Sequence, residues 1–346
     1  MSRESVGKDL TALLEAVARG RSLTVDEAEA AFDRFMDGSA SEAQMAGLLV
    51  GLRAKGIDAA EVAGGVRALR KAMLPVVATA PDRLVDTAGT GGGSVTTFNI
   101  STAAALVVAG AGVPVAKHGN RSFTSKCGSA DVLEALGVGI NLTPARMGEV
   151  LEEVGIVFMF APLLHPAMKH VGSVRRALGI TTIMNILGPL TNPAGARRQV
   201  IGVADPALLG LVPGALRELG HLRALVVHGE PGMDEVSPVG ATRVAELMDD
   251  GQIRDYEITP RSVGLEPARV EELAGGDPAR NAAIIECVLE GELGGTRSAV
   301  VMNAAAALLA ADTAESWEEA ARLAEASIDR GRAADALKRL REATTR

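Results

Sequence analysis

Short apolar runs that do not alternate with polar residues recur through the middle of the chain. They read IVFMF at residues 156–160, TTIMNIL at 181–187, QVIGVA at 199–204 and ALVVHG at 224–229. A continuous run indicates a strand buried on both faces, as in parallel sheets. Earlier, RLVDTAG (83–89), STAAALVVAGAG (101–112) and VPVAKHG (113–119) predict strand, glycine-rich loop, helix and strand in succession. The sequence therefore predicts an α/β domain with a mostly parallel β-sheet flanked by helices, and ligands at the carboxyl ends of the strands.

The first 73 residues carry helix signals and almost no strand signals. Capping-box patterns open three apolar-periodic segments, at Thr24/Glu27, Ser39/Glu42 and Asp58/Glu61. Glycines stand where those helices should stop, at Gly20, Gly38 and Gly56. We therefore predict a small helical domain over residues 1–73, joined in space by a helical segment near 165–180, and an α/β domain over 74–346. Beyond residue 266 the pattern is again mainly helical, with a GGDP turn at 275–278.

The bulk composition excludes several classes of function. The formal net charge of -8 disfavours nonspecific nucleic-acid binding, which needs clustered Lys and Arg, although a local positive pocket for a small anion is compatible with it. Two cysteines, Cys127 and Cys287, are too few for a disulfide framework and fit a reducing cytoplasm. The first ten residues lack the apolar core of a signal peptide, and the apolar run at 103–116 is too short to span a bilayer. We expect a cytoplasmic protein without a membrane role.

The stretch DTAGTGGGSVTTFNIST, at residues 86–102, contains a glycine-rich loop that leads into a predicted helix. Gly89, Gly91, Gly92 and Gly93 leave backbone amides unshielded, and residues 99–102 begin a helix whose free N–H groups point back at the loop. This combination predicts an anion site. The stretch matches neither a P-loop nor GxGxxG. A simple tight turn is the alternative.

A second polar loop, KHGNRSFTSKCGS at residues 117–129, follows a predicted strand. Lys117 and Arg121 are suited to neutralise phosphate charge, and hydroxyl donors are offered by Ser122, Thr124, Ser125 and Ser129. The loop favours polyanion binding. The alternative is a solvated polar loop.

Adjacent carboxylates follow the ALVVHG strand in MDEVS, at residues 233–237. Asp234 and Glu235 suggest Mg²⁺, a hard cation that often shares its shell with substrate phosphates, although adjacent acids are also common on ordinary loops. The five histidines show no HExxH spacing and the chain has no GxSxG, which disfavours zinc chemistry and Ser-His hydrolysis. In FAPLLHPAMKHVGSVRR, at 160–176, Arg175 is a candidate for binding an organic acid; the alternative is a loop and an ordinary basic helix.

Taken together and in order, GTGG with NIST, KHGNRS, FAPLLHPAMKHVGSVR, NILGPLTNPAG and VVHGEPGMDE closely resemble the anthranilate phosphoribosyltransferase family over nearly the whole chain. The resemblance implies a nucleoside phosphorylase/phosphoribosyltransferase-like fold. It also implies transfer of phosphoribosyl from phosphoribosyl diphosphate to the amine of anthranilate in tryptophan biosynthesis, and a homodimer joined through the helical domain. The implied cofactor is Mg²⁺, with two ions per subunit.

The resemblance also implies the site residues. The phosphoribosyl diphosphate would contact Gly89, Gly92, Gly93, Thr97, Asn99, Ile100, Ser101, Thr102, Lys117, His118, Gly119, Asn120, Arg121, Ser122, Phe123, Thr124, Ser125 and Ser129. Mg²⁺ would use Ser101, Asp234 and Glu235. Anthranilate would meet Gly89, Asn120 and Arg175, with His118, Pro162 and His165 lining its access path.

One position departs from the family pattern. Most members read GTGGD, whereas this chain has Gly93, so a carboxylate near the diphosphate and its metal is missing and only a backbone contact is expected there. The chemistry itself needs no strong acid–base pair, because an aromatic amine is unprotonated at neutral pH. Mg²⁺, Lys117 and the loop amides would stabilise the departing pyrophosphate and an oxocarbenium-like ribosyl centre. Arg175 would hold the carboxylate of anthranilate as a forked donor.

Two other functions compete with this prediction. Pyrimidine nucleoside phosphorylases share the two-domain plan and a related glycine loop, but Asp86-Thr87-Ala88 precedes the loop here, where those enzymes have Lys-His-Ser. A non-catalytic relative that binds nucleic acid is disfavoured by the net acidity.

Overall fold

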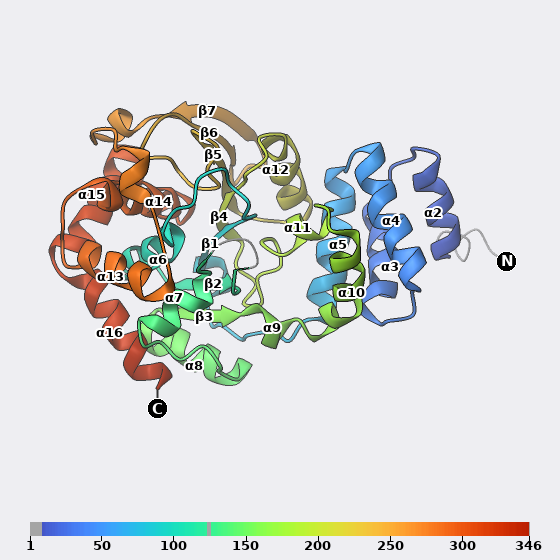
Figure 1. Cartoon of the computed structure of the whole chain (residues 1–346), viewed down its shortest axis with the longest axis horizontal. Helices are drawn as coiled ribbons and strands as arrows, with labels where there is room; N and C mark the ends of the chain where they lie inside the picture. The colour runs from blue at the N-terminus through green and yellow to red at the C-terminus, as the bar shows by residue number, and fades with distance from the viewer. Residues whose placement is uncertain (1–8, 123–125, 346) are drawn as a thin grey trace.

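The computed structural model describes residues 9–122 and 126–345. In it a bundle of helices lies beside a larger part built on one sheet (Figure 1). The bundle begins with α2 (Leu10–Ala18), α3 (Val25–Met36), α4 (Glu42–Lys55) and α5 (Ala59–Ala72). None of the helices in the described ranges is long and apolar enough to cross a bilayer.

The caps of the bundle helices follow the sequence pattern with one correction. The Thr24/Glu27 capping box opens α3, and Glu61 accepts from the backbone N–H of Asp58 at the start of α5. The box predicted at Ser39/Glu42 is wrong, because Ser41 is the N-cap of α4 and pairs with Gln44 instead. Both pairs have capping-box spacing, and the helix starts two residues later than predicted. Left-handed glycines follow α2, α3 and α4 at Gly20, Gly38 and Gly56.

The helix α10 (Lys169–Leu178) returns from the α/β part to pack against α3 and α4 (Figure 1). Val171 and Val174 are buried in the core of the bundle. The same core continues through α11 (Met184–Leu187) and α12 (Leu208–Glu218) onto one face of the sheet. Segments distant in sequence therefore share one core, and the domain boundary at residue 73 stays a prediction.

The sheet has seven strands in the order β3-β2-β1-β4-β5-β6-β7. Their bounds are β1 (Val85–Gly89), β2 (Val115–Gly119), β3 (Ile156–Phe160), β4 (Arg198–Gly202), β5 (Arg223–Gly229), β6 (Thr242–Leu247) and β7 (Ile253–Ile258). The first five run parallel, and β6 and β7 are antiparallel additions. Val200 packs into one core and Ile201 into the other, so β4 is buried on both faces, as continuous apolar runs predict. The predicted fold class is confirmed.

One predicted strand is wrong. Residues 181–187 contain the short helix α11 rather than a strand. Ile183, Met184, Ile186 and Leu187 are buried at a spacing that fits one side of a helical turn.

Helices cover the other face of the sheet (Figure 1). They are α6 (Ile100–Gly110), α7 (Ser129–Ala135), α8 (Pro144–Val154), α13 (Pro278–Leu289), α14 (Gly295–Ala310), α15 (Trp317–Asp329) and α16 (Arg332–Thr344). The short α9 (Ala161–Leu164) directly follows β3. Short 3₁₀ turns complete the chain at Pro81–Arg83, Pro166–Met168, Pro260–Val263 and Val270–Leu273. The α6 helix is rich in Ala and buried along most of its length, and Ser327 on α15 donates a hydrogen bond of 2.8 Å to the Val107 carbonyl.

A polar network closes the amino end of β5. The chain's single Trp and single Tyr meet there, with Trp317 Nε1 donating to the Tyr256 hydroxyl at 3.1 Å. Tyr256 donates in turn to Glu246 at 2.8 Å, and Glu246 forms an ion pair with Arg223 at 2.7 Å. The network ties β5, β6 and β7 to α15.

Candidate functional site

The chain begins the sheet at β1 in its interior and adds later strands first on one side of β1 and then on the other. Chain connections lead from β1 outward to β2 and β3 on one side, while β4 and β5 lie on its other side. In open α/β sheets, ligands bind outside the carboxyl ends of the strands at such a switch point. Here β1, β2, β4 and β5 all end in glycine, at Gly89, Gly119, Gly202 and Gly229.

Two kinds of glycine make up this edge. A Cβ atom on Gly89 would lie 2.7 Å from Asp234 Oδ2, and one on Gly202 would lie 1.7 Å from the Asp234 carbonyl oxygen, so these glycines make room for Asp234. By contrast, Gly91 and Gly92 have φ of +70° and +82°, and a Cβ atom there would meet nothing within 4 Å. The outer part of the loop is therefore open to a ligand. A Cβ atom on Gly93 would lie 3.1 Å from both Asp234 Oδ1 and the Gly232 carbonyl oxygen, so a side chain at this position would begin beside Asp234.

The two adjacent carboxylates lie between the glycine loop and the start of α6. Asp234 Oδ2 accepts from the backbone N–H of Gly91 at 2.8 Å, and Glu235 Oε1 accepts from that of Ser101 at 3.2 Å. The buried Asn303 on α14 holds the following residue, Val236, through both its N–H (2.9 Å) and its C=O (2.8 Å). The loop that carries the carboxylates is thus fixed on three sides.

The carboxylates carry the electrostatic signature of a cation site. Burial raises the pKa of Asp234, and burial together with the Asp234 charge raises the pKa of Glu235 to about 8. A divalent cation would compensate two acids held together in this way. The described residues contain no group of three or more His, Cys, Asp or Glu that could hold a metal, so hydroxyl, water or phosphate oxygens would have to complete the shell. A shared shell of hard oxygen ligands is what Mg²⁺ prefers, and the residues present therefore fit this ion.

Lys117 is the buried cation of the site. Its Nζ donates to the Thr87 carbonyl at 2.6 Å, to Thr87 Oγ1 at 3.2 Å and to Ser101 Oγ at 3.4 Å. Burial lowers the pKa of Lys117, and the charges of Asp86 and Glu235 oppose that shift. The ammonium group therefore lies between the end of β1, which leads into the glycine loop, and the first turn of α6.

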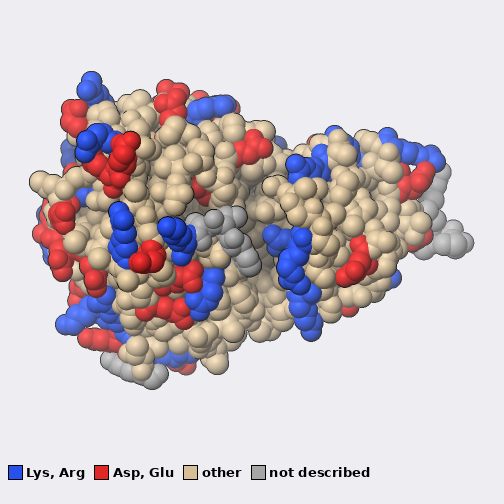
Figure 2. All heavy atoms as spheres, in the orientation of Figure 1, with Lys and Arg blue, Asp and Glu red and all other residues tan. Residues whose placement is uncertain are grey.

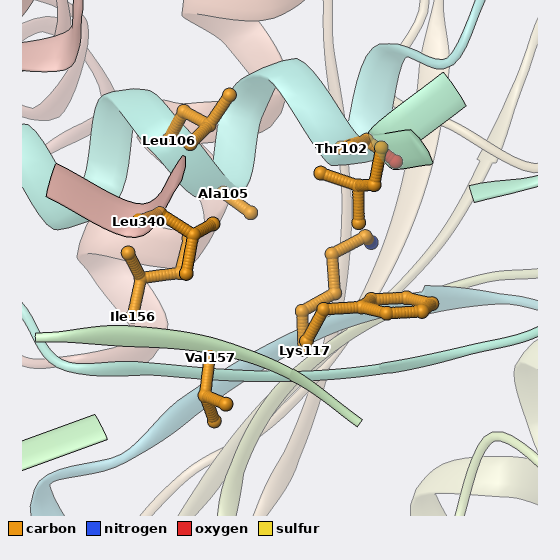
Figure 3. Close-up of a pocket in the computed structure, with 9 residues that line it drawn as sticks. Thr102, Ala105, Leu106, Lys117, Ile156, Val157 and Leu340 are labelled. Atoms are coloured by element: carbon orange, nitrogen blue, oxygen red, sulfur yellow. The ribbon is translucent and has the colours of Figure 1, made fainter. Parts of the chain in front are cut away.

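A small cavity lies beneath Lys117, between α6 and the sheet. It is lined by Thr102, Ala105, Leu106, Lys117, Leu133, Ile156, Val157, Phe158 and Leu340. Figure 3 shows the side chain of Lys117 rising from β2 toward Thr102 through this apolar layer. Its volume is only about 10 Å³, so the cavity is too small for either predicted substrate. Its apolar walls direct the ammonium group toward the carboxyl end of the sheet.

Asp86 is a site residue that sequence reasoning missed. It is buried in the middle of β1 and accepts hydrogen bonds from the backbone N–H of His118 (3.2 Å), from Asn192 Nδ2 (2.8 Å) and from Gln199 Nε2 (3.2 Å). Asn192 belongs to the LTNPAG stretch and also donates to the Ala116 carbonyl at 2.8 Å. An acidic residue inside an apolar strand was the available signal, because buried charges need partners.

The loop after β2 is organised by an acid on α7. Asp131 accepts from the backbone N–H of Gly128 at 2.8 Å and forms an ion pair with Arg121 at 2.7 Å. Arg121 also pairs with Glu134 at 2.6 Å, so its charge is already engaged by two carboxylates. Ser129 Oγ donates to the carbonyl of Asn120, at 3.2 Å. The predicted contacts Phe123, Thr124 and Ser125 lie outside the described residues.

The remaining residues predicted to contact phosphoribosyl diphosphate lie just before α6 and in its first turn. Asn99 is its N-cap, and Thr97 bridges to Ala274 from the C-terminal region. The Ile100 side chain is buried. The prediction of free N–H groups at this helix start is wrong, because the N–H of Ile100 donates to the Phe98 carbonyl, that of Ser101 to Glu235 and that of Thr102 to the Asn99 carbonyl. Thr102 Oγ1 is buried and has no hydrogen-bond partner in the described part of the chain, and the Thr102 side chain lines the small cavity beside Lys117.

The predicted anthranilate residues form a second group. His118 Nε2 and His165 Nε2 are 3.1 Å apart, and burial lowers the pKa of His118 to about 3 and that of His165 to about 4. Both rings are therefore neutral at pH 7. Pro162 is exposed at the start of α9. Arg175, in the last turn of α10, is half-buried, and its guanidinium makes no hydrogen bond or ion pair within residues 9–122 and 126–345. Figure 2 shows basic side chains gathered on this face beside the junction of the bundle and the α/β part.

Comparison with known proteins agrees with this architecture. Residues 81–334 match the family model described as "Glycosyl transferase family, a/b domain", and residues 11–73 match "Glycosyl transferase family, helical bundle domain". Fold and site together define a glycosyl transferase that combines a helical bundle with an α/β domain.

Individual relatives show to which family of glycosyl transferases the chain belongs. The anthranilate phosphoribosyltransferase of Symbiobacterium thermophilum is 51% identical over 337 residues, which cover 97% of this chain and 98% of that protein. That of Moorella thermoacetica is 50% identical, covering 94% and 95% of the two chains. The chain belongs to the anthranilate phosphoribosyltransferase family, and the predicted resemblance is confirmed.

Solved structures of this family share the fold. The enzyme from Thermus thermophilus superposes with a TM-score of 0.91 at 43% identity, covering 96% of this chain and 99% of that one. The enzyme from Saccharomyces cerevisiae, in complex with PRPP and Mg, gives a TM-score of 0.87 at 26% identity, with 99% of each chain covered.

Proposed function

We propose that the chain transfers the phosphoribosyl group of 5-phosphoribosyl 1-diphosphate to the amine of anthranilate, in tryptophan biosynthesis. The products are N-(5-phosphoribosyl)anthranilate and pyrophosphate. One observation carries the proposal: the open glycine loop, the start of α6, Lys117 and the Asp234–Glu235 pair converge at one edge of the sheet. This is the set of groups that a doubly phosphorylated sugar requires.

The diphosphate end of the donor would bind where the open glycine loop and a buried cation meet. A Cβ atom on Gly91 or Gly92 would meet nothing within 4 Å, so the loop backbone borders open space, and Lys117 Nζ lies next to Ser101 at the start of α6. Both arrangements stabilise negative charge that builds up on pyrophosphate as it leaves. Catalysis would then be electrostatic and positional, with Lys117 supporting the leaving group and no residue acting as a nucleophile.

We also propose that the reaction depends on Mg²⁺, with two ions per subunit. Asp234, Glu235 and the Ser101 hydroxyl would hold the metal. When bound, Mg²⁺ supplies further positive charge against the leaving diphosphate. The complex of the Saccharomyces cerevisiae relative with PRPP and Mg supports the presence of a Mg²⁺ site.

Anthranilate would bind on the side of α10. The unpaired guanidinium of Arg175 is suited to hold the carboxylate through two parallel hydrogen bonds, while Asn120 lies across the site on the loop after β2. The neutral His118–His165 pair offers a polar surface without charge to an uncharged aromatic amine. The amine needs no strong base, so positioning is the main requirement.

Assembly and location complete the proposal. We propose a homodimer joined through the helical bundle, whose Ala- and Leu-rich helices suit such an interface. Cys127 and Cys287 are not joined in a disulfide, which supports a reducing cytoplasm.

The decisive experiment follows the loss of anthranilate fluorescence after addition of phosphoribosyl diphosphate and Mg²⁺, repeated with a chelator. We expect turnover that stops on chelation and returns when Mg²⁺ is restored. Phosphorolysis of thymidine or uridine, measured in parallel, should be absent. Activity with the nucleosides and none with anthranilate would reverse the assignment and favour a pyrimidine nucleoside phosphorylase.

A further inference from the structure

The N-cap of α6 uses its side chain in an unusual way. An N-cap Asn normally accepts a hydrogen bond from the backbone N–H of the second or third helical residue. The Asn99 side chain makes no such bond, and the N–H of Ser101 donates to Glu235 instead. Something else must therefore hold the Asn99 amide.

That partner comes from α13. Asn281, in the first turn of this helix, is buried, and its Nδ2 donates to Asn99 Oδ1 at 2.9 Å. Cys127 Sγ donates to the same oxygen at 3.3 Å, and Asn99 Nδ2 donates to the Cys127 carbonyl at 3.2 Å. The Asn99 amide is thus held between α13 and the loop that follows β2.

The turn before α13 supports the same place through its backbone. Asn281 Oδ1 accepts from the N–H of Gly276 at 2.7 Å, which fixes the GGDP turn to the helix. Just before that turn, the Leu273 carbonyl accepts from the N–H of Phe98 at 3.0 Å. A Cβ atom on Gly275 would lie only 2.6 Å from the Thr97 carbonyl oxygen. The turn therefore forms a close-fitting wall behind the residues that lead into α6.

We propose that Asn281 is a positioning residue for the phosphoribosyl diphosphate site. By engaging Asn99 Oδ1, it keeps the N-cap side chain away from the first turn of α6. The N–H of Ser101 is then available to Glu235, and this bond holds the carboxylate at the start of α6, where the metal ion of the donor site is proposed to bind. Asn281 acts through Asn99 at the start of α6, whereas Arg175 lies on α10, which packs against the helical bundle, so the role concerns the donor and not anthranilate. This inference rests on the proposed function.

The test is Asn281→Asp, which keeps the size of the side chain and the oxygen that accepts from Gly276 but places an acceptor against Asn99 Oδ1. We expect the KM for phosphoribosyl diphosphate to rise about tenfold, the size expected when one buried hydrogen bond is lost. The KM for anthranilate should stay within about twofold of wild type. The rise in Tm that saturating donor gives the protein should shrink in parallel, which is a readout independent of turnover.

A double-mutant cycle shows whether Asn281 acts through Asn99. In an Asn99→Ala background, Asn281→Asp should cause no further rise in the donor KM. The matched control is Ser327→Ala, which removes a buried hydrogen bond to the Val107 carbonyl in the other half of α6. It should lower Tm without changing the donor KM.

Several results would overturn the inference. These are an unchanged donor KM in Asn281→Asp, equal changes in both KM values, or additive effects in the cycle. If Asn281→Asp does not fold, Asn281→Ala and Asn99→Ala are compared instead, and unequal effects on donor-induced stabilisation count against the role. An inactive wild-type enzyme would be a different failure, because it would refute the proposed function and not the Asn281–Asn99 coupling.

Discussion

The close packing of Asp234 against β4 makes Gly202→Ala a demanding test of the site. The new Cβ atom would lie 1.7 Å from the Asp234 carbonyl oxygen and 2.3 Å from its carbonyl carbon. A carbon–oxygen contact needs roughly 3.3 Å, so the Asp234 backbone must move by about 1.6 Å. Gly202 is not among the residues with positive φ, and the cost is therefore one of space and not of backbone strain.

We expect two measurable consequences. Overpacking of this kind lowers the free energy of unfolding by about 1–3 kcal/mol. Because the displaced residue carries a carboxylate proposed to bind Mg²⁺, kcat/KM should also fall by about 100-fold, as for other displacements of catalytic groups by about 1 Å. The Mg²⁺ concentration for half-maximal activity should rise as well.

The assays are thermal unfolding and Mg²⁺ titration of the transfer rate, with Gly210→Ala as the matched control. Gly210 lies exposed on α12, where an added Cβ would meet nothing within 4 Å, and the change should be neutral or stabilising by about 0.4–1 kcal/mol. Wild-type stability and Mg²⁺ response in Gly202→Ala would refute the argument that Asp234 is fixed by contact with β4.

Three further predictions follow from the site. Arg175→Ala should raise the KM for anthranilate while sparing that for the donor, since it removes only the carboxylate fork; steady-state kinetics with each substrate varied would check this. Asp234→Asn combined with Glu235→Gln should abolish the Mg²⁺ response, and metal dependence equal to wild type would exclude these carboxylates as ligands. Burial lowers the pKa of His118 to about 3 and of His165 to about 4, from 6.5. The unfolded chain therefore takes up protons first as pH falls below 6.5, and the folded state loses stability between pH 6.5 and about 4; His165→Gln should show a shallower loss of Tm over this range.

The parallel strands could be predicted because they bury both faces. IVFMF at 156–160 forms β3 with those same bounds, and ALVVHG lies within β5. The outer strands β6 and β7 were not predicted. Arg254, Asp255 and Glu257 on β7 are exposed, and the strand is held at the sheet edge by pairing with β6, which local sequence does not reveal.

The candidate site was only partly predictable for a related reason. Gly91, Lys117 and Asp234 belong to dense local motifs, and the structure brings them to one edge of the sheet. The long-range supports were missed because their partners are distant in sequence. Asn281 lies 182 residues from Asn99, and Asn303 lies 67 residues from Val236. An isolated buried Asn in a helical pattern gives no sign of the backbone it will bind.

The contact between Trp317 and Tyr256 has a practical consequence for spectroscopy. Trp317 and Tyr256 lie near the amino end of β5, whereas Asp234 follows the carboxyl end of the same strand. The fluorescence of Trp317, the only Trp in the chain, therefore arises far from the carboxyl edge of the sheet, where the candidate site lies. A shift in Trp317 emission on adding phosphoribosyl diphosphate, which is not aromatic, would report a structural change transmitted across the sheet. Unchanged emission would indicate that the surroundings of Trp317 do not change when this substrate binds.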